Sequence, residues 1–205
     1  MIDQDFTTNL IAKHDYLSKI SHADCLTLSC LPAHWVEFAK FLNLEETFEL
    51  LVDLTAVDQG DTADIRFEVV AHFYSRTHHD YLRVHIDCLD NECPEVDSIA
   101  SIYPAADWHE REAFDMFGIV FAGHPNLKRI LMWDEYPYHP LRKEFPLAGI
   151  DTPLPAADVV EATGASVEPA PMMGGPFVSP GNDPMSDAEP RAKDESWTEQ
   201  TEKPV

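Results

Sequence analysis

Apolar and polar residues alternate along three successive stretches of the chain between residues 48 and 88. The apolar positions are Phe48, Leu50, Val52, Leu54 and Ala56, then Ile65, Phe67, Val69, Ala71 and Phe73, then Leu82, Val84, Ile86 and Cys88. A period of two indicates strands that bury one face and leave the other more polar. Turn-forming residues at 58–61 and 75–80 separate the stretches. The pattern predicts a three-stranded meander whose apolar face covers a core.

Two helices and a strand are predicted before the meander. Residues 9–20 read as a short amphipathic helix. Its apolar positions are Leu10, Leu17 and Ile20. Leu26 and Leu28 alternate with polar residues and indicate a strand. Pro32 then sits where a helix begins, because its missing N–H costs nothing there. The apolar residues that follow have helical spacing: Trp35, Phe38, Ala39 and Leu42.

A third helix is predicted to begin at Asp107. The Asp107 carboxylate suits a helix cap, and Glu110, three residues on, completes a pair that resembles a capping box. Gly118 stands where the residue that ends a helix often needs a positive φ. The apolar stripe of the predicted helix is Ala113, Phe114 and Phe117.

These elements predict an α+β fold, with helices packed on one face of a small mixed or antiparallel sheet, followed by an irregular extended segment. Residues 1–120 form the predicted α+β domain, 121–149 an extended partner-binding segment, and 150–205 an acidic, proline-rich tail. The tail holds nine of the sixteen prolines and lacks a sustained apolar period. It cannot offset the entropy of folding alone, so we expect it to be disordered or ordered only against a partner.

The formal net charge of −23 limits the classes of partner that the chain is expected to bind. An acidic surface repels nucleic acid and anionic lipid, so neither is expected as a direct ligand. No apolar run approaches the roughly 20 residues that span a bilayer. The first ten residues carry acids where a signal peptide needs bases. We therefore expect a cytoplasmic chain with reduced cysteines.

The cysteines and histidines are candidate metal ligands. Cys25 and Cys30 flank a predicted strand, and Cys88 and Cys93 end another; a strand between two ligands holds them too far apart for a structural zinc knuckle. Burial as small apolar residues is the preferred interpretation. The histidines that could gather at one end of a hairpin are His72, His78, His79 and His85. A stand-alone metal enzyme that uses them is the remaining alternative.

Residues 108–147 concentrate charge, aromatic rings and four prolines in one run. The run contains no nucleophile–base pair, metal-ligand spacing or phosphate loop. Arg111 is expected to face outward and to form a surface ion pair with Asp115 one turn on. A solvated helix face would explain the acids and bases of the helix. The basic residues that follow on proline-rich chain favour contacts with a neighbouring protein instead.

The order of residues in this run closely resembles the signature of the thirty-kilodalton subunit of respiratory complex I, which in bacteria is the C subunit of the proton-pumping NADH:quinone oxidoreductase. The residues that carry the resemblance are Glu110-Arg111-Glu112, Asp115-Met116-Phe117-Gly118-Ile119, Phe121, Gly123-His124-Pro125, Leu127 to Leu131, and His139-Pro140-Leu141-Arg142-Lys143. Two positions depart from the family pattern. Lys128 precedes Arg129 where an arginine is common, and Tyr138 replaces a glycine, which puts the local turn in question.

The resemblance implies a core subunit of the hydrophilic arm, peripheral to the cell inner membrane on its cytoplasmic side. FMN and iron–sulfur clusters belong to the parent complex, and the resemblance implies no cofactor, metal or catalytic residue in this chain. It implies partners among the other subunits, chiefly D and B, with membrane contact only through the complex. The residues expected to bind partners are Glu110, Arg111, Glu112, Asp115, His124, Lys128, Arg129, His139, Arg142 and Lys143.

A homologous subunit of a membrane-bound NiFe hydrogenase-type complex is the alternative within this resemblance, because such complexes share the fold and parts of the signature. If the signature binds partners, charge reversal at Arg111 or Arg142 should harm assembly more than folding. The tail beyond residue 150 should be sensitive to protease when the chain is free.

Overall fold

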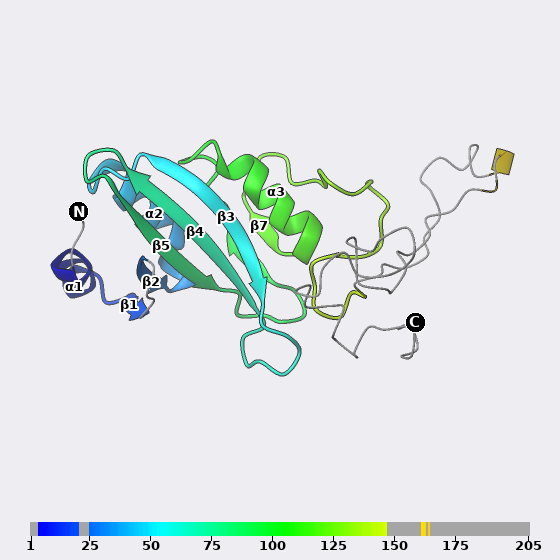
Figure 1. The fold of residues 1–205 in the computed structure, drawn as a ribbon, viewed down its shortest axis with the longest axis horizontal. Helices are drawn as coiled ribbons and strands as arrows, with labels where there is room; N and C mark the ends of the chain where they lie inside the picture. The colour runs from blue at the N-terminus through cyan, green and yellow to red at the C-terminus, as the bar shows by residue number, and fades with distance from the viewer. Residues whose placement is uncertain (1–3, 21–24, 147–160, 163, 165–205) are drawn as a thin grey trace, which may run out of the picture. The chain divides into compact units, whose positions relative to one another are not determined.

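The structure is a computed structural model that describes residues 4–20, 25–146, 161, 162 and 164 (Figure 1). The chain divides into two compact units, residues 1–143 and 144–205, and the fold below is that of the first. The predicted tail at 150–205, with its expected protease sensitivity, lies almost entirely outside the described residues. In the described part, no helix is long and apolar enough to cross a membrane.

A five-stranded mixed sheet forms the centre of the first unit. Its strands, in spatial order, are β1 (Leu17–Ile20), β2 (Leu26–Cys30), β5 (Asp80–Asp87), β4 (Phe67–Ser75) and β3 (Leu50–Asp58). The predicted meander is the antiparallel run β3–β4–β5. The last strand of the meander, β5, pairs in parallel with β2, and β1 pairs antiparallel with β2 at the edge.

The core face of the sheet matches the predicted alternation in β4 and β5, where the apolar residues from Phe67 to Phe73 and from Leu82 to Ile86 are buried. In β3 the predicted phase is correct for Leu54 and Ala56, which are buried, but wrong before them. Leu50 and Val52 are exposed, while Leu51 is buried. A register shift between Leu51 and Asp53 inserts an extra residue, and such a bulge turns the preceding side chains to the opposite face.

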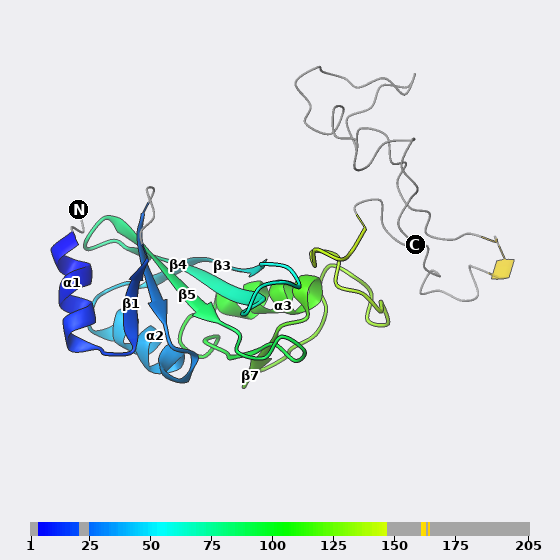
Figure 2. The ribbon, with the colours of Figure 1, turned by 90° about the horizontal axis from the view of Figure 1, so that it is seen from below.

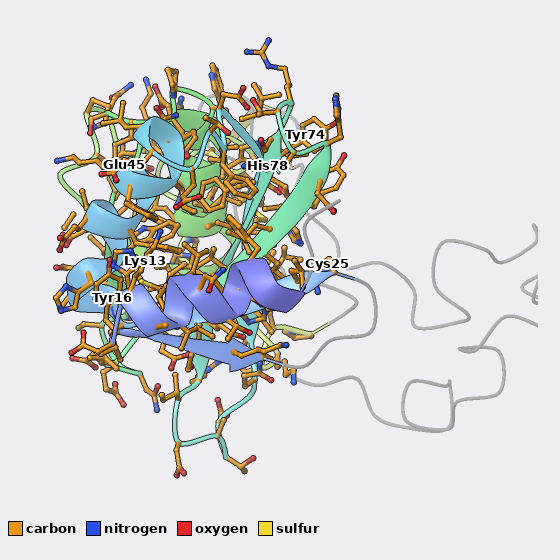
Figure 3. All side chains as sticks on the ribbon, turned by 90° about the vertical axis from the view of Figure 1, so that its left-hand side faces the viewer. Lys13, Tyr16, Cys25, Glu45, Tyr74 and His78 are labelled. Carbon is orange, nitrogen blue, oxygen red and sulfur yellow. The ribbon has the colours of Figure 1, made fainter. Side chains whose placement is uncertain are left out.

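The predicted helix at 9–20 is shorter and earlier than expected. The structure has α1 (Gln4–Lys13), and β1 follows from Leu17. Leu17 pairs with Cys30 of β2 and is buried, so pairing with a neighbouring strand outweighs the local helical spacing. Figure 3 looks onto this end of the unit, where α1 lies across the front with Lys13 at its C-terminal end. His78 packs there against Phe6 of α1.

The helix after Pro32 is confirmed. A short 3-10 turn, η1 (Pro32–His34), leads into α2 (Trp35–Leu44), whose buried residues are the four that the spacing indicated. Trp35 packs against Phe73 of β4, with 6.1 Å between ring centroids. Figure 2 shows α2 and α3 (Ala106–Phe117) on the same side of the sheet. The α+β fold with helices on one face is therefore correct.

Tyr103 ties the loop before α3 to the core. Its hydroxyl group donates a hydrogen bond to the carbonyl oxygen of Phe48 at 2.8 Å, and its ring packs 5.1 Å from Phe73. Strands on either side of α3, β6 (Glu95–Asp97) and β7 (Val120–Ala122), pair in parallel as a small second sheet. Both ends of α3 are thereby fixed, which positions the charged residues of the signature.

Candidate functional site

The candidate site consists of α3 and of residues 121–143. We call residues 121–143 the signature segment. The capping role expected of Asp107 is wrong. Ala105 precedes the helix, and no side chain caps it there. Glu110 does not reach back to a cap residue; it is fully buried, and its carboxyl group accepts the Ile99 N–H at 2.8 Å and the Ser98 hydroxyl at 2.5 Å. The glutamate therefore joins α3 to the loop before it.

Glu110 lies in an environment that disfavours its charged form. Burial raises the pKa of Glu110 to about 7, the hydrogen bonds from Ser98 and Ile99 lower it in part, and the negative charge of Asp107 raises it further. Because a carboxyl group with this pKa changes protonation near neutral pH, Glu110 is a titrating group inside the fold.

His124 fixes the start of the signature segment to α3. Its side chain is fully buried, with Nε2 3.1 Å from the carbonyl oxygen of Asp107. Its Nδ1 accepts the N–H of Asn126 at 2.9 Å, so the ring proton of the neutral form must sit on Nε2 and point at Asp107. The same Nε2 is 3.9 Å from the Glu110 carboxyl group.

The expected surface ion pair between Arg111 and Asp115 is absent, because the signature segment covers that face of α3. Arg111 is only 8% exposed; its Nε donates to the carbonyl oxygen of Lys128 at 3.2 Å. Its guanidinium group lies over the ring of Trp108, 4.9 Å from the centroid. Arg111 thus binds backbone within its own chain and supports an exposed tryptophan.

Asp115 is the anchor of the signature segment. Its carboxylate is fully buried, and one oxygen accepts the N–H groups of residues 130, 131 and 132 at 2.7–2.9 Å. The other oxygen pairs with the Arg129 guanidinium group at 2.5 Å. Burial alone would raise the pKa of Asp115, but these backbone and guanidinium contacts outweigh it and hold the pKa below its ordinary value.

Basic residues of the signature segment cap the C-terminal end of α3. Arg129 and His139 both contact the carbonyl oxygen of Asp115, at 3.1 and 3.0 Å. Arg142 donates through Nε to the carbonyl oxygen of Phe117 at 2.7 Å. The last carbonyls of a helix lack intrahelical partners and carry partial negative charge. These side chains therefore satisfy the helix end and complement its dipole.

Gly118 is required where α3 ends. Its φ is +76°, a left-handed conformation that favours glycine, as the sequence predicted. A Cβ at this position would lie 2.6 Å from Nε2 of His139 and 2.7 Å from Nη2 of Arg142. The capping side chains approach the backbone closely because no side chain stands there. Tyr138, where the family resemblance leads us to expect a glycine, is not among the described residues with positive φ, so the turn forms without that conformation.

A second buried carboxylate, which the sequence did not indicate, holds the end of the signature segment. Asp58 of β3 accepts two hydrogen bonds from Arg66, at 3.0 Å each, and the N–H groups of Lys143 and Gly60 at 2.8 Å. Burial acts to raise the pKa of Asp58, but these hydrogen bonds lower it to about 2. The contact from Lys143 joins residues 85 positions apart, which no local pattern reveals.

The structure thus divides the ten residues singled out in the sequence into two groups. The side chains of seven form hydrogen bonds within the chain and build the site: Glu110, Arg111, Asp115, His124, Arg129, His139 and Arg142. Glu112, Lys128 and Lys143 are exposed. The same helix and segment also expose large apolar side chains: Trp108 is 64% exposed, Leu131 61% and Leu141 54%.

Three of the four histidines proposed as metal ligands have other contacts. Arg83 donates to Nε2 of His72 at 2.7 Å, His85 pairs with Glu68, and His78 contacts the carbonyl oxygen of Glu46. Across the described residues, no group of three or more His, Cys, Asp and Glu is placed to hold a metal ion. Cys30 and Cys88 are buried as expected, and burial raises the pKa of each thiol to about 12. The expectation is wrong for Cys93, which is exposed, and Cys25 is only partly buried.

The chain is similar to proteins of one family. Residues 28–151 match the family model described as respiratory-chain NADH dehydrogenase, 30 Kd subunit. The C subunit of NADH-quinone oxidoreductase from Neisseria meningitidis serogroup B is 42% identical over 131 residues, which are 60% of this chain and 66% of that protein. The corresponding protein of Rhodobacter capsulatus is 45% identical over 127 residues, 60% and 62% of the two chains. The match therefore spans just under two thirds of these relatives.

A relative from Sulfurihydrogenibium, whose name joins the C and D subunits of NADH-quinone oxidoreductase, is 42% identical over 125 residues, which are 60% of this chain and 21% of that protein. Two solved structures share the fold. A trypsin-resistant fragment of Nqo5 has a TM-score of 0.52 at 23% identity, covering 59% of this chain and 97% of the fragment. A chain of the archaeal membrane-bound sulfane sulfur reductase has a TM-score of 0.59 at 22% identity, covering 79% and 91%. With more than half of its length matched by the family model, the chain belongs to the 30 kDa subunit family of the respiratory-chain NADH dehydrogenase.

Proposed function

We propose that this chain is a non-catalytic core subunit of the peripheral, hydrophilic arm of a proton-translocating NADH:quinone oxidoreductase. In this proposal, electrons pass from NADH through FMN and iron–sulfur centres to quinone in other subunits, and the chain serves to dock and stabilise its neighbours. Family membership supports the assignment to the complex. Charged side chains of the signature form hydrogen bonds with backbone groups of the same chain. These contacts support a docking role over a catalytic one.

The single observation that carries the docking proposal is the surface that the signature presents. The buried charges hold α3 and residues 121–143 in one arrangement, and this arrangement exposes Trp108, Leu131 and Leu141. Aromatic side chains are enriched among the residues that anchor protein interfaces, and the buried core of an interface is more apolar than its rim. We infer that these three residues, together with the exposed Glu112, Lys128 and Lys143, contact the partner directly. The other seven signature residues act by shaping the surface.

We propose the D and B subunits as the neighbours of this chain. As part of the complex, the chain is assigned to the cytoplasmic side of the inner membrane. The relative from Sulfurihydrogenibium supports the D subunit as a neighbour, since its name joins the two subunits in one protein. The proposal for the B subunit rests on the family resemblance. Membrane contact is assigned to the complex, consistent with described helices that are too short or too polar to span a bilayer.

A homologous subunit of a hydrogenase-type membrane complex is the second candidate. The observation that favours it is the fold shared with a chain of the sulfane sulfur reductase, a respiratory membrane complex. That likeness, at 22% identity, concerns the fold alone. The two candidates differ in what should copurify with the chain.

The experiment is affinity purification of the tagged full chain from gently solubilised membranes, followed by an NADH:quinone activity assay on the eluate. An eluate with this activity, flavin and iron–sulfur clusters supports the first proposal. Nickel with hydrogenase activity would replace it with the second candidate, and an eluate of the chain alone would overturn both.

The docking surface is tested in the same assay by a double variant, Trp108→Ala with Leu131→Asp. We expect recovery of neighbouring subunits to fall by about tenfold, the effect of losing about 1.4 kcal/mol of binding free energy. The matched control is Leu89→Asp, which changes a leucine that is 74% exposed in the loop after β5. Equal recovery with the double variant, at an unchanged melting temperature of the free chain, would contradict the assigned surface.

A further inference from the structure

Arg111, beside Trp108 of the docking surface, carries a charge that no described carboxylate pairs with. The residue is only 8% exposed. Its Nε donates to the carbonyl oxygen of Lys128, but Nη1 and Nη2 have no hydrogen-bond or ion-pair partner among the described residues. Neither nitrogen is one of the fully buried polar atoms that lack a partner there, so both reach the surface. Arginine is rarely buried to this degree unless it is paired.

Two contacts fix the orientation of the Arg111 guanidinium group. Its central carbon lies over the Trp108 ring, 4.9 Å from the centroid, and its Nε–H is held by the carbonyl oxygen of Lys128 at 3.2 Å. Rotation of the group would break one of these contacts or both. Nη1 and Nη2 therefore form a fixed fork at the free end of the side chain. The two oxygens of a carboxylate match the geometry of such a fork.

We propose that Arg111 binds one carboxylate side chain, from an aspartate or a glutamate of the neighbouring subunit, through Nη1 and Nη2. The inference rests on the function proposed above, because that function supplies the subunit that covers Trp108. Arg111 then has two roles: it shapes the docking surface through Trp108 and Lys128, and it contacts the partner itself.

The buried charge of Arg111 selects the class of partner group. A subunit that covers Trp108 also removes Arg111 from its remaining solvent. An apolar or basic group at that place would leave the guanidinium group buried without a compensating charge, which is strongly unfavourable. Although Glu110 and Glu112 flank Arg111 in the sequence, no carboxylate of α3 forms an ion pair with it. A carboxylate from the partner supplies both the missing charge and two acceptors.

The surroundings of the fork favour a single carboxylate over a larger anion. Lys128, whose backbone contacts Arg111, is exposed and has no ion pair among the described residues, so it adds positive charge beside the site. The net charge of −23 opposes the approach of nucleic acid or of an anionic lipid surface far more than that of one side chain. The chemistry at Arg111 therefore fits an acidic residue of a protein.

The first test measures the reactivity of Arg111 in the wild-type chain toward phenylglyoxal, which attacks the terminal nitrogens of arginine. Arg111 should react in the free full chain, where its fork is open, and should be protected in the affinity-purified complex. Arg129 is the internal control, because its Nη1 and Nη2 are both bonded within the chain and should be protected in both states. Equal reaction of Arg111 in the two states, or none in the free chain, would overturn the proposal.

The second test is recovery of neighbouring subunits with tagged Arg111→Gln, at low and at high salt. Recovery at low salt should fall about tenfold relative to the wild type, because the partner's carboxylate loses its counterion. The difference should shrink at high salt, which screens the wild-type ion pair. Arg76→Gln is the matched control. Arg76 pairs with Glu49, its side chain is 70% exposed, and the same change there should preserve wild-type recovery and salt dependence.

The outcomes separate this site from the proposed function. A wild-type chain that recovers no other subunit would overturn the proposed function, and the carboxylate site with it. A wild-type chain that recovers its neighbours, with equal recovery by Arg111→Gln, would overturn the site alone. A loss with Arg111→Gln that is the same at low and high salt would show that Arg111 acts only through the shape of the surface. If Arg111→Gln fails to fold, as judged by its melting temperature, the phenylglyoxal measurement decides without a variant.

Discussion

Asp115 and Arg129 form an ion pair between α3 and the signature segment, with 2.5 Å between Oδ1 of the aspartate and Nη1 of the arginine. Asp115 has no exposed surface, and its other carboxylate oxygen accepts three successive backbone N–H groups from residues 130–132. One side chain thus orients both the arginine and the backbone that follows it. The helix and the segment that covers it form a single structural unit through this contact.

Replacing Asp115 with asparagine should destabilise the free chain strongly. The amide keeps an acceptor oxygen but removes the charge that Arg129 and three N–H groups share. Loss of one partner from a buried pair costs about 3–5 kcal/mol, because the other partner stays buried without compensation. Equilibrium urea unfolding measures the change. Glu112→Gln, on the exposed side of the same helix, should change the unfolding free energy by less than about 0.5 kcal/mol. Equal effects of the two substitutions would show that Asp115 is not the anchor.

Two glycines with nearly the same backbone conformation allow the cost of backbone strain to be measured apart from the cost of steric overlap. Gly118 and Gly123 have φ of +76° and +77°, but a Cβ at Gly123 meets nothing within 4 Å. Gly123→Ala should therefore show only the cost of the left-handed conformation, about 1–2 kcal/mol. Gly118→Ala should cost about 1–3 kcal/mol more, because His139 and Arg142 must move. Thermal melts of both variants provide the comparison, and a Gly118 effect no larger than that of Gly123 would exclude the close approach.

Arg142 illustrates how the geometry changes an expectation drawn from the sequence. If Arg142 bound a partner, reversal of its charge should harm assembly more than folding. Its Nε, however, donates to the Phe117 carbonyl oxygen at the end of α3, and its guanidinium group lies 5.0 Å from the centroid of the buried Phe67 ring. We now expect Arg142→Glu to destabilise the free chain by about 2 kcal/mol, since it sets a carboxylate against the negative end of a helix.

The control for Arg142→Glu is Lys128→Glu, which reverses an exposed charge of the same segment. Unfolding of the free chains is measured first, and copurification of partners second. Lys128→Glu should leave the free chain as stable as the wild type. If Arg142→Glu also folds normally and yet loses its partners, Arg142 contacts the neighbouring subunit directly.

The parts of the fold that the sequence predicted are those in which local pattern and tertiary contacts agree. The alternation in β4 and β5 shows the buried face because both strands pair regularly along their length. In β3 a bulge changes the phase, and apolar Leu50 and Val52 gave no sign that they would face outward. At residues 14–20 the apolar spacing predicts a helix, but residues 17–20 instead pair with β2. Their partners are residues 27–30, which lie outside the short stretch of sequence from which the spacing is judged.

The candidate site, like the fold, was predicted only in part from local sequence patterns. Arginines on proline-rich chain do need partners, as the sequence suggested, but Arg129 and Arg142 find them at the end of α3. The identity of those acceptors depends on how the segment folds back, which spacing does not encode. Ser98, Tyr103 and Asp58 were missed because a serine, a tyrosine or an aspartate in a loop or strand is ordinary. Only the buried contacts that they make distinguish them.

Acid should weaken the attachment of the signature segment through Asp58. Its pKa falls from 3.8 to about 2 in the folded chain, so the folded state binds the proton less tightly than the unfolded state. The resulting stabilisation is fully present above pH 3.8 and is lost as the pH falls toward 2; at about 1.4 kcal/mol per pKa unit it amounts to roughly 2 kcal/mol. Asp58→Asn should remove this part of the pH dependence of the unfolding free energy between about pH 2 and pH 4. Asp61, which also pairs with Arg66 but has a side chain 71% exposed, is the matched control. Asp61→Asn should keep the wild-type slope, and a wild-type slope in Asp58→Asn as well would show that the proton is taken up elsewhere.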